Sequence, residues 1–129
     1  MISRANIFDH GVAWEMGNSV TQGYSINGTI YISGQFSHDL NGFIDGDIET
    51  QTRLTLDNLD RVLKGFGITK SNLAYLEIYL TKPQEHFEQF VQVFKEYLGG
   101  HRPAATLVGV TYLASPQQIV EISAIAHAS

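Results

Sequence analysis

The stretch Gln-Ile-Val-Glu-Ile-Ser-Ala-Ile-Ala, at residues 118–126, has the alternating and mostly apolar pattern of a buried β-strand. Its only charged residue is Glu121, which shares one face of the strand with Ile119, Ser123 and Ile125. A carboxylate in an apolar strand is costly unless it is paired, hydrogen-bonded or protonated. We therefore expect Glu121 to lie either at a wet edge of the sheet or in a cleft that uses its acid–base chemistry.

Other stretches of the chain also alternate as strands do. Asn27 and Gly28 form the strongest short-range signal for a type I′ turn, so they predict a hairpin between two of these stretches. A short turn around Ser115 and Pro116 is expected to join the last two strands. The predicted strands cover residues 20–26, 29–34, 73–81, 104–113 and 118–126, and residues 2–8 can form one more.

Two helices are predicted from apolar residues that recur at helical spacing. The first covers residues 48–66, with Asp47 suited to its N-terminus and Gly67 to its C-terminal cap. The second begins at Pro83, a favoured first position, and ends at the Gly-Gly pair of residues 99 and 100. The element order is therefore β-β-α-β-α-β-β. The connecting segments are an irregular one at residues 9–19 and a polar loop at residues 35–47.

Two helices with one-sided apolar stripes can cover only one face of a sheet. The opposite face is predicted to carry large apolar side chains, namely Tyr31, Tyr75, Tyr79, Leu107 and Ile119. A surface of this kind is too apolar to remain in water. We therefore predict a homo-oligomer in which several copies pack these faces together in a closed ring.

The composition narrows the class of protein. Of the 129 residues, 43% are hydrophobic and 16% charged, and we interpret residues 1–129 as one globular domain. The net charge of −5 argues against nucleic acid as the main partner. The absence of cysteine excludes thiol catalysis and thiolate metal sites. No apolar stretch is long enough to cross a membrane or to serve as a signal peptide, so we expect a cytoplasmic protein.

The histidines give no sign of a metal site. They are scattered along the chain without the spacing of metal ligands, at His10, His38, His86, His101 and His127. We expect them on the surface or in loops, and we expect neither a bound metal nor a cofactor.

Four motifs match the pattern of one family, and three of them, the first, second and fourth, are specific in combination. The four motifs are Tyr-Ile-Ser-Gly-Gln at residues 31–35, Thr-Leu-Asp-Asn-Leu at residues 55–59, Arg-Pro-Ala at residues 102–104 and Val-Glu-Ile-Ser-Ala-Ile-Ala at residues 120–126. From residue 22 onward the chain resembles the RidA/YjgF family, the reactive-intermediate imine deaminases. The resemblance implies a chorismate-mutase-like α+β sandwich that forms homotrimers, with a small-molecule cleft at each subunit interface.

The resemblance also assigns residues to this cleft. In deaminating members an arginine that binds the substrate carboxylate follows the Pro-Ala pair, and here that position is Ala105. Two positions later the family's usual cysteine is replaced by Leu107, whose backbone can still bond a ligand. Ser33, Gly34 and Glu121 are retained. The cleft is thus expected to keep its acid–base carboxylate and to lack the arginine.

Three further positions bear on the ligand. Val20 and Val91 stand where the family has a tyrosine and an asparagine, so we expect an apolar pocket that prefers a neutral or weakly polar ligand. Trp14 belongs to an N-terminal segment that runs near the cleft in this family. It is either a pocket wall or a packing anchor.

Two functions of different classes remain open. In the first, Glu121 positions water for the hydrolysis of an imine or enamine, but not of the usual 2-imino acids, because Ala105 replaces the arginine. In the second, the same trimer binds a small metabolite or a protein partner without turnover. The alternative role for Glu121 is structural, as a carboxylate bonded to backbone amides or to an interface partner. A third function, RNA cleavage, has been attributed to some family members. It is the least compatible with the negative net charge of this chain.

Overall fold

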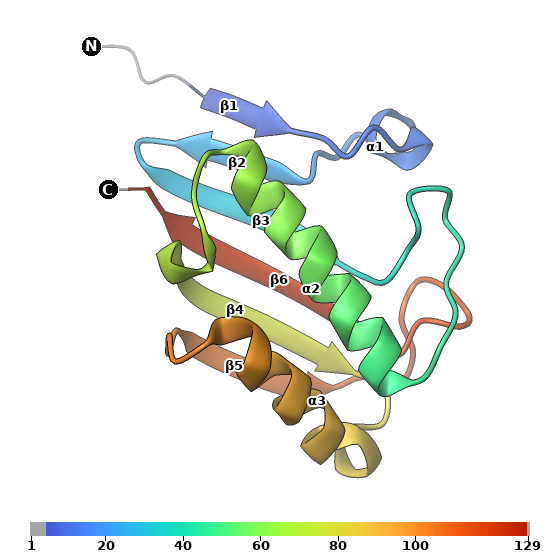
Figure 1. Cartoon of the computed structure of the whole chain (residues 1–129). Helices are drawn as coiled ribbons and strands as arrows, with labels where there is room; N and C mark the ends of the chain where they lie inside the picture. The colour runs from blue at the N-terminus through green and yellow to red at the C-terminus, as the bar shows by residue number, and fades with distance from the viewer. Residues whose placement is uncertain (1–4, 129) are drawn as a thin grey trace.

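Strand β6 lies inside a six-stranded mixed sheet with the strand order β1-β2-β3-β6-β4-β5 (Figure 1). The computed structural model describes residues 5–128, so residues 2–4 of the predicted first strand lie outside the described part. The elements are β1 (Ala5–Phe8), α1 (Ala13–Gly17), β2 (Gly23–Ile26), β3 (Thr29–Gln35), α2 (Ile48–Gly65), the 3₁₀ turn η1 (Lys70–Asn72), β4 (Leu73–Leu80), α3 (Pro83–Leu98), β5 (Ala104–Gly109) and β6 (Val120–His127).

Helices α2 and α3 cover one face of the sheet (Figure 1). The β6 side chains on that face are all buried in one apolar core: Val120, Ile122, Ala124 and Ala126. The strand β6 runs antiparallel to both of its neighbours, β3 and β4, whereas β5 runs parallel to β4 and is joined to it through α3. The predicted α+β class, with two long helices on one face of a mixed sheet, is confirmed.

The opposite face of the sheet, which we call the open face, carries a row of large side chains. Tyr24 pairs with Tyr31, Tyr31 with Ile125, and Ile125 with Tyr75, so these residues lie side by side across four strands. Tyr24 is 43% exposed and Tyr31 is 50% exposed. A contiguous row of exposed tyrosines is unusual for a free surface.

Two residues predicted for the open face lie elsewhere. Leu107 is the register partner of buried Ile78, so its side chain points to the helix side and packs against the core there. Ile119 also packs against that core, because it precedes β6 and its amide is bonded to the Gln51 side chain of α2. The prediction for these two residues was wrong, because the face of Leu107 depends on the register of β5 with β4 and Ile119 lies outside the paired part of β6.

The two long helices begin and end where their capping residues allow. Asp47 accepts a hydrogen bond from the Thr50 amide at the start of α2, and Pro83 is the first residue of α3. Helix α3 ends at Gly99, which adopts a left-handed conformation with φ of 59°. Helix α2 ends at Gly65, and the predicted cap Gly67 follows with φ of 73°.

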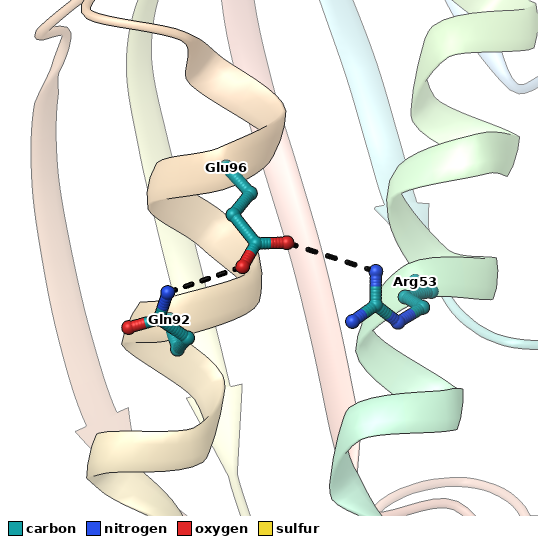
Figure 2. Close-up of polar contacts among 3 residues, drawn as sticks. All are labelled: Arg53, Gln92 and Glu96. Carbon is teal, nitrogen blue, oxygen red and sulfur yellow. Dashed lines mark hydrogen bonds and ion pairs between the residues drawn. The ribbon is translucent and has the colours of Figure 1, made fainter.

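Polar side chains connect α2 and α3 on their outer surface. Figure 2 shows Arg53 Nη1 3.9 Å from Glu96 Oε2, while Gln92 donates to the other oxygen of Glu96 at 3.1 Å. Both charged side chains are more than half exposed, so this pair adds little to stability. Deeper between the helices, the Tyr97 hydroxyl donates to Asp60 at 2.9 Å.

Three predicted segments differ from the structure. The irregular segment at residues 9–19 contains the short helix α1, whose N-cap residue Val12 donates its amide to the Glu15 side chain. Strand β5 ends at Gly109, not residue 113, because its partner β4 ends at Leu80. The connection from β5 to β6 is correspondingly longer than a short turn, and β4 lies between the two strands. Among residues 5–128, no helix combines the length and apolar character that a membrane crossing requires.

Candidate functional site

A cavity of about 560 Å³ opens beside the part of the sheet where β3 and β6 lose their regular register. Four of the predicted site residues line it: Glu121, Ser33, Gly34 and Trp14. The other lining residues are Asn18, Val20, Thr21, Gln22, Phe36, Gly42, Ala114 and Ser115. We call this space the Glu121 cavity. Segments that are far apart in the sequence thus meet where the motif pieces predicted a site.

The space for the carboxylate comes from a β-bulge. Ile32 pairs with Ala124 and Gln35 with Ile122, so β3 holds one more residue than β6 between these pairs. Gly34 lies in this bulge, and a Cβ added to it would overlap Oε2 of Glu121 and lie 2.7 Å from Cδ. Only a glycine lets the side chain of Glu121 lie against the β3 backbone at this point.

The Glu121 carboxylate is held on one side only. The Gln118 side-chain amide donates to Oε1 at 2.9 Å and also to the Val120 carbonyl at 3.3 Å. Gln118 is 2% exposed, so its amide is a fixed part of the site. Within the described part of the chain, no lysine, arginine or histidine lines the cavity. The carboxylate therefore lies in a cavity without a lining cation to neutralise it.

Trp14 forms an aromatic wall of this cavity. Its ring centroid lies 6.0 Å from that of Phe36 and 4.9 Å from that of His38, which it meets edge to face. A Cβ added to Gly42 would lie 3.7 Å from the indole ring, so the ring also covers the loop that follows β3. Trp14 thus contacts both the cavity and the packed loop, and the two roles expected for it are compatible.

A buried polar network behind the cavity was not predicted from the sequence. Glu15 is 3% exposed and accepts hydrogen bonds from the backbone amides of His10, Gly11 and Val12. Burial opposes ionisation of the Glu15 carboxyl, but the hydrogen bonds from the Gln22 side chain and from these amides outweigh it and lower its pKa. This carboxylate is fully engaged within the protein, so it is structural.

The same network reaches β3 through glutamine side chains. The Gln35 amide donates to Gln22 Oε1 at 2.9 Å and to the Ser33 carbonyl at 3.0 Å, while Gln35 Oε1 lies 2.9 Å from His10 Nε2. These contacts explain why the Ser-Gly-Gln motif contains a glutamine, because the Gln35 side chain holds the backbone of the bulge in place. The Ser-Gly-Gln motif was the available signal for this network.

His38 lies in the loop after β3, in line with the expectation that the histidines lie on the surface or in loops, but it is buried there. It is 4% exposed, and its ring centroid lies 5.5 Å from that of His10. Burial, followed by the neighbouring His10, lowers the pKa of His38 to about 4. Its Nδ1 accepts a hydrogen bond from the Leu40 amide, and the Asn58 amide of α2 donates to the carbonyls of Phe36 and His38. The asparagine of the Leu-Asp-Asn-Leu motif thus anchors this loop.

The remaining two predicted site residues lie outside the cavity. Ala105 and Leu107 belong to β5 at the edge of the sheet, with β4 between β5 and β6. Leu107 packs against the helix-side core, and Ala105 is exposed. A single chain therefore does not bring these residues to Glu121, and their assignment to one cleft stays a prediction that requires a second subunit.

Known proteins resemble this chain over most of its length. The family model described as Endoribonuclease L-PSP matches residues 14–128. A RutC family protein from Sulfurisphaera tokodaii is 34% identical over 107 residues, which cover 81% of this chain and 84% of the relative. The mitochondrial protein mmf2 of Schizosaccharomyces pombe is 36% identical over 112 residues, which cover 85% of this chain and 88% of the relative.

Solved structures share the fold. A YjgF family member from Mycobacterium tuberculosis has a TM-score of 0.87 at 24% identity, covering 96% of this chain and 99% of that chain. A Rid family protein from Yersinia pestis has a TM-score of 0.85 at 28% identity, with the same coverage. The predicted chorismate-mutase-like fold is confirmed by these likenesses.

The contact between Gly34 and Glu121 can be tested by a double-mutant cycle. Gly34→Ala is expected to lower the free energy of unfolding by about 1–3 kcal/mol, because the new methyl group displaces the carboxylate. The same change in a Glu121→Ala background should cost clearly less. Chemical denaturation of the four proteins measures both effects. Gly17→Ala is the control, since a Cβ there meets nothing within 4 Å; equal costs of Gly34→Ala in the two backgrounds would contradict the contact.

Acid should destabilise the fold through His38. Its pKa is about 4 in the folded protein and ordinarily 6.5, so between these values the unfolded chain binds a proton that the folded chain does not. Stability is therefore lost as the pH falls through this window, by roughly 2–3 kcal/mol from this group. His38→Asn, whose side-chain oxygen can still accept from Leu40, should flatten the profile of unfolding free energy between pH 7 and 4. His127→Asn, at an exposed site, should leave the profile of the parent; an unchanged slope in His38→Asn would refute the assignment.

Proposed function

The chain belongs to the RidA/YjgF family, and from this premise we propose that it is an imine or enamine hydrolase with its active cleft between the subunits of a homotrimer. The observation that carries this proposal is the Glu121 carboxylate, which lines a cavity beside the β3 bulge with one oxygen fixed by Gln118. A carboxylate in such a place suits the positioning of water.

The proposed reaction is the addition of water to a C=N bond. A water molecule gives a proton to Glu121 as its oxygen attacks the imine carbon, and the imine nitrogen takes up a proton to form a carbinolamine. The protonated Glu121 then gives its proton to the amino nitrogen, which leaves as ammonia when the C–N bond breaks. The hydroxyl proton passes to the solvent, which replaces the proton that the imine nitrogen took up, and a carbonyl compound remains. An enamine must first be protonated at carbon to give the imine. General acid–base assistance of this kind contributes about 10²–10⁴-fold.

The trimer is proposed from the open face. Its row of tyrosines needs a partner surface, and a second copy of the same face supplies one. In such an assembly the exposed edge strand β5 can bring Ala105 and the backbone near Leu107 to the Glu121 cavity of a neighbouring subunit. We propose this arrangement because it unites the predicted site residues that one chain keeps apart. The cytosol remains the proposed location, although the S. pombe relative is named as mitochondrial.

The proposed substrates lack a carboxylate. Ala105 stands where the resemblance places the arginine that binds a substrate carboxylate, and a bidentate arginine is not replaced by other groups without loss. A second candidate, ligand binding without turnover, is favoured by the same replacement, since it removes a substrate-binding group. Cleavage of RNA, which the family description suggests, fits poorly with a net charge of −5 and a cavity without lining cations.

Loss of the carboxylate should abolish catalysis. Glu121→Gln keeps the size of the side chain and an oxygen for Gln118, and it is expected to lower kcat/KM for a carboxylate-free imine by about 10²-fold or more. The imine is formed in situ by oxidation of an aliphatic amine, and release of ammonia is followed. Glu88→Gln, at an exposed position of α3, is the matched control and should retain full activity.

The same assay separates the two candidate functions. Hydrolysis of a 2-imino acid should show negligible acceleration by the parent protein, since no arginine follows the Pro-Ala pair. Equal rates for the parent and Glu121→Gln would remove the catalytic role of the carboxylate. No acceleration of any imine, together with a ligand retained on the purified protein, would favour binding without turnover.

The oligomer can be tested by charging the open face. Native mass spectrometry should show the parent protein at three times the mass of one chain. Tyr31→Lys should shift the population to monomers, because an ammonium group would be buried without a partner. Leu54→Lys replaces an apolar residue that is 39% exposed on α2, away from the open face, and should remain trimeric. A monomeric parent protein at micromolar concentration would contradict the proposal.

A further inference from the structure

We propose that the Glu121 cavity selects ligands by a positively charged nitrogen that bears N–H groups, attached to a small apolar or aromatic body. The substrate class is then a protonated imine derived from an arylalkyl or alkyl amine. This inference rests on the proposed function for the reaction, but the selection for a cation is a property of the cavity that binding alone can test. It replaces the expectation, drawn from the sequence, that the ligand is neutral.

The charge of the cavity is the first argument. Glu121 is the only ionisable side chain among the described residues that line it. Two other carboxylates lie behind the wall, namely Asp9, which accepts the Thr21 hydroxyl at 2.7 Å, and Glu15, which accepts from backbone amides. His38 lies behind Trp14 and is uncharged near neutral pH, because burial and the neighbouring His10 lower its pKa to about 4. The lining that one chain supplies thus carries one negative charge and no positive charge.

The hydrogen-bonding groups of the cavity point to the same ligand. The Ser33 hydroxyl donates its only proton to the Thr21 carbonyl at 2.7 Å, so its oxygen can serve a ligand only as an acceptor. The Glu121 carboxylate is likewise an acceptor, and Gln118 occupies just one of its oxygens. Because Ser33 and Glu121 both line the cavity, they can together bind a group that has two hydrogen-bond donors. A protonated imine or a primary ammonium group has the required donors, whereas a carboxylate has none.

The walls suit the rest of such a molecule. Trp14 and Phe36 lie with their ring centroids 6.0 Å apart and their planes tilted by 35°, and both line the cavity. Aromatic faces attract cations as well as apolar groups. A volume of about 560 Å³ is ample for an arylalkyl amine. The cavity therefore combines an anionic acceptor with an aromatic wall.

The selection for a cation also fits the proposed chemistry. Protonation makes the carbon of a C=N bond more electrophilic, so the form that the cavity binds best is the form that water attacks most readily. An imine that carries a carboxylate would place a second negative charge near Glu121 and would be repelled. Alanine at position 105 therefore has two effects. It removes a group that would bind a substrate carboxylate, and it removes a cation that would oppose the charge of Glu121.

The experiment uses Trp14, the only tryptophan of the chain, as the reporter. Its fluorescence is followed during titration of the intact protein with three molecules of similar size, namely 2-phenylethylammonium, 2-phenylethanol and 3-phenylpropionate. The ammonium is expected to bind about tenfold more tightly than the alcohol, and the carboxylate more weakly than both. Glu121→Gln should lower the affinity for the ammonium about tenfold and leave that for the alcohol within about twofold. Glu88→Gln should match the parent protein.

Each result decides the inference. Equal or tighter binding of the carboxylate, or a preference for the ammonium that survives in Glu121→Gln, would overturn it. The comparison of the three ligands on the parent protein needs no variant, so it holds even where a variant fails to fold. A clear preference for the ammonium without hydrolysis of any imine would support the inference while removing the proposed hydrolase function.

Discussion

The site depends on one constraint, which is that a carboxylate lies on β6, an interior strand whose side chains on the helix side are buried in the apolar core. Two residues accommodate the Glu121 side chain. The Gln118 amide donates a hydrogen bond to one carboxylate oxygen, and Gly34 has no Cβ at the place where the other oxygen lies. The bulge that presents Gly34 interrupts the regular pairing of β3 with β6. The cavity opens at this interruption, so the accommodation of the charge and the formation of the site have the same structural cause.

Side chains of helix α2 form hydrogen bonds that hold the loops near the cavity. The buried Gln51 side chain donates to the carbonyls of Gly46 and Gln117 and accepts from the Ile119 amide. These three bonds connect the loop before α2 to the segment before β6. Asn58, two turns later on the helix, anchors the loop after β3 by its bonds to Phe36 and His38. Buried carbonyls without partners are costly, so these amides hold both loops in place.

The sequence allowed the long helices, the Asn-Gly hairpin and the location of Glu121 to be predicted, because periodicity and turn residues report on local geometry. It failed where a contact over a long sequence distance decided the outcome. Leu107 was assigned to the wrong face because its orientation depends on the register with β4. His38 lies in a loop as expected, but its burial against Trp14 and Phe36 was not predicted, because no local pattern reports the approach of these rings.

The identity of residue 105 has a consequence beyond the loss of one contact. In members of the family that the chain resembles, an arginine at this position would oppose the charge of the cleft carboxylate. With Ala105 in its place, and with Gln118 as a neutral partner, the described residues leave the negative charge of Glu121 uncompensated. The electrostatic energy between a cleft and a charged ligand is dominated by the charged groups that lie nearest to the ligand. In the proposed trimer, where β5 of a neighbouring subunit approaches Glu121, this one replacement would reverse the sign of the charge that the cleft prefers, while the carboxylate and the fold that holds it stay the same.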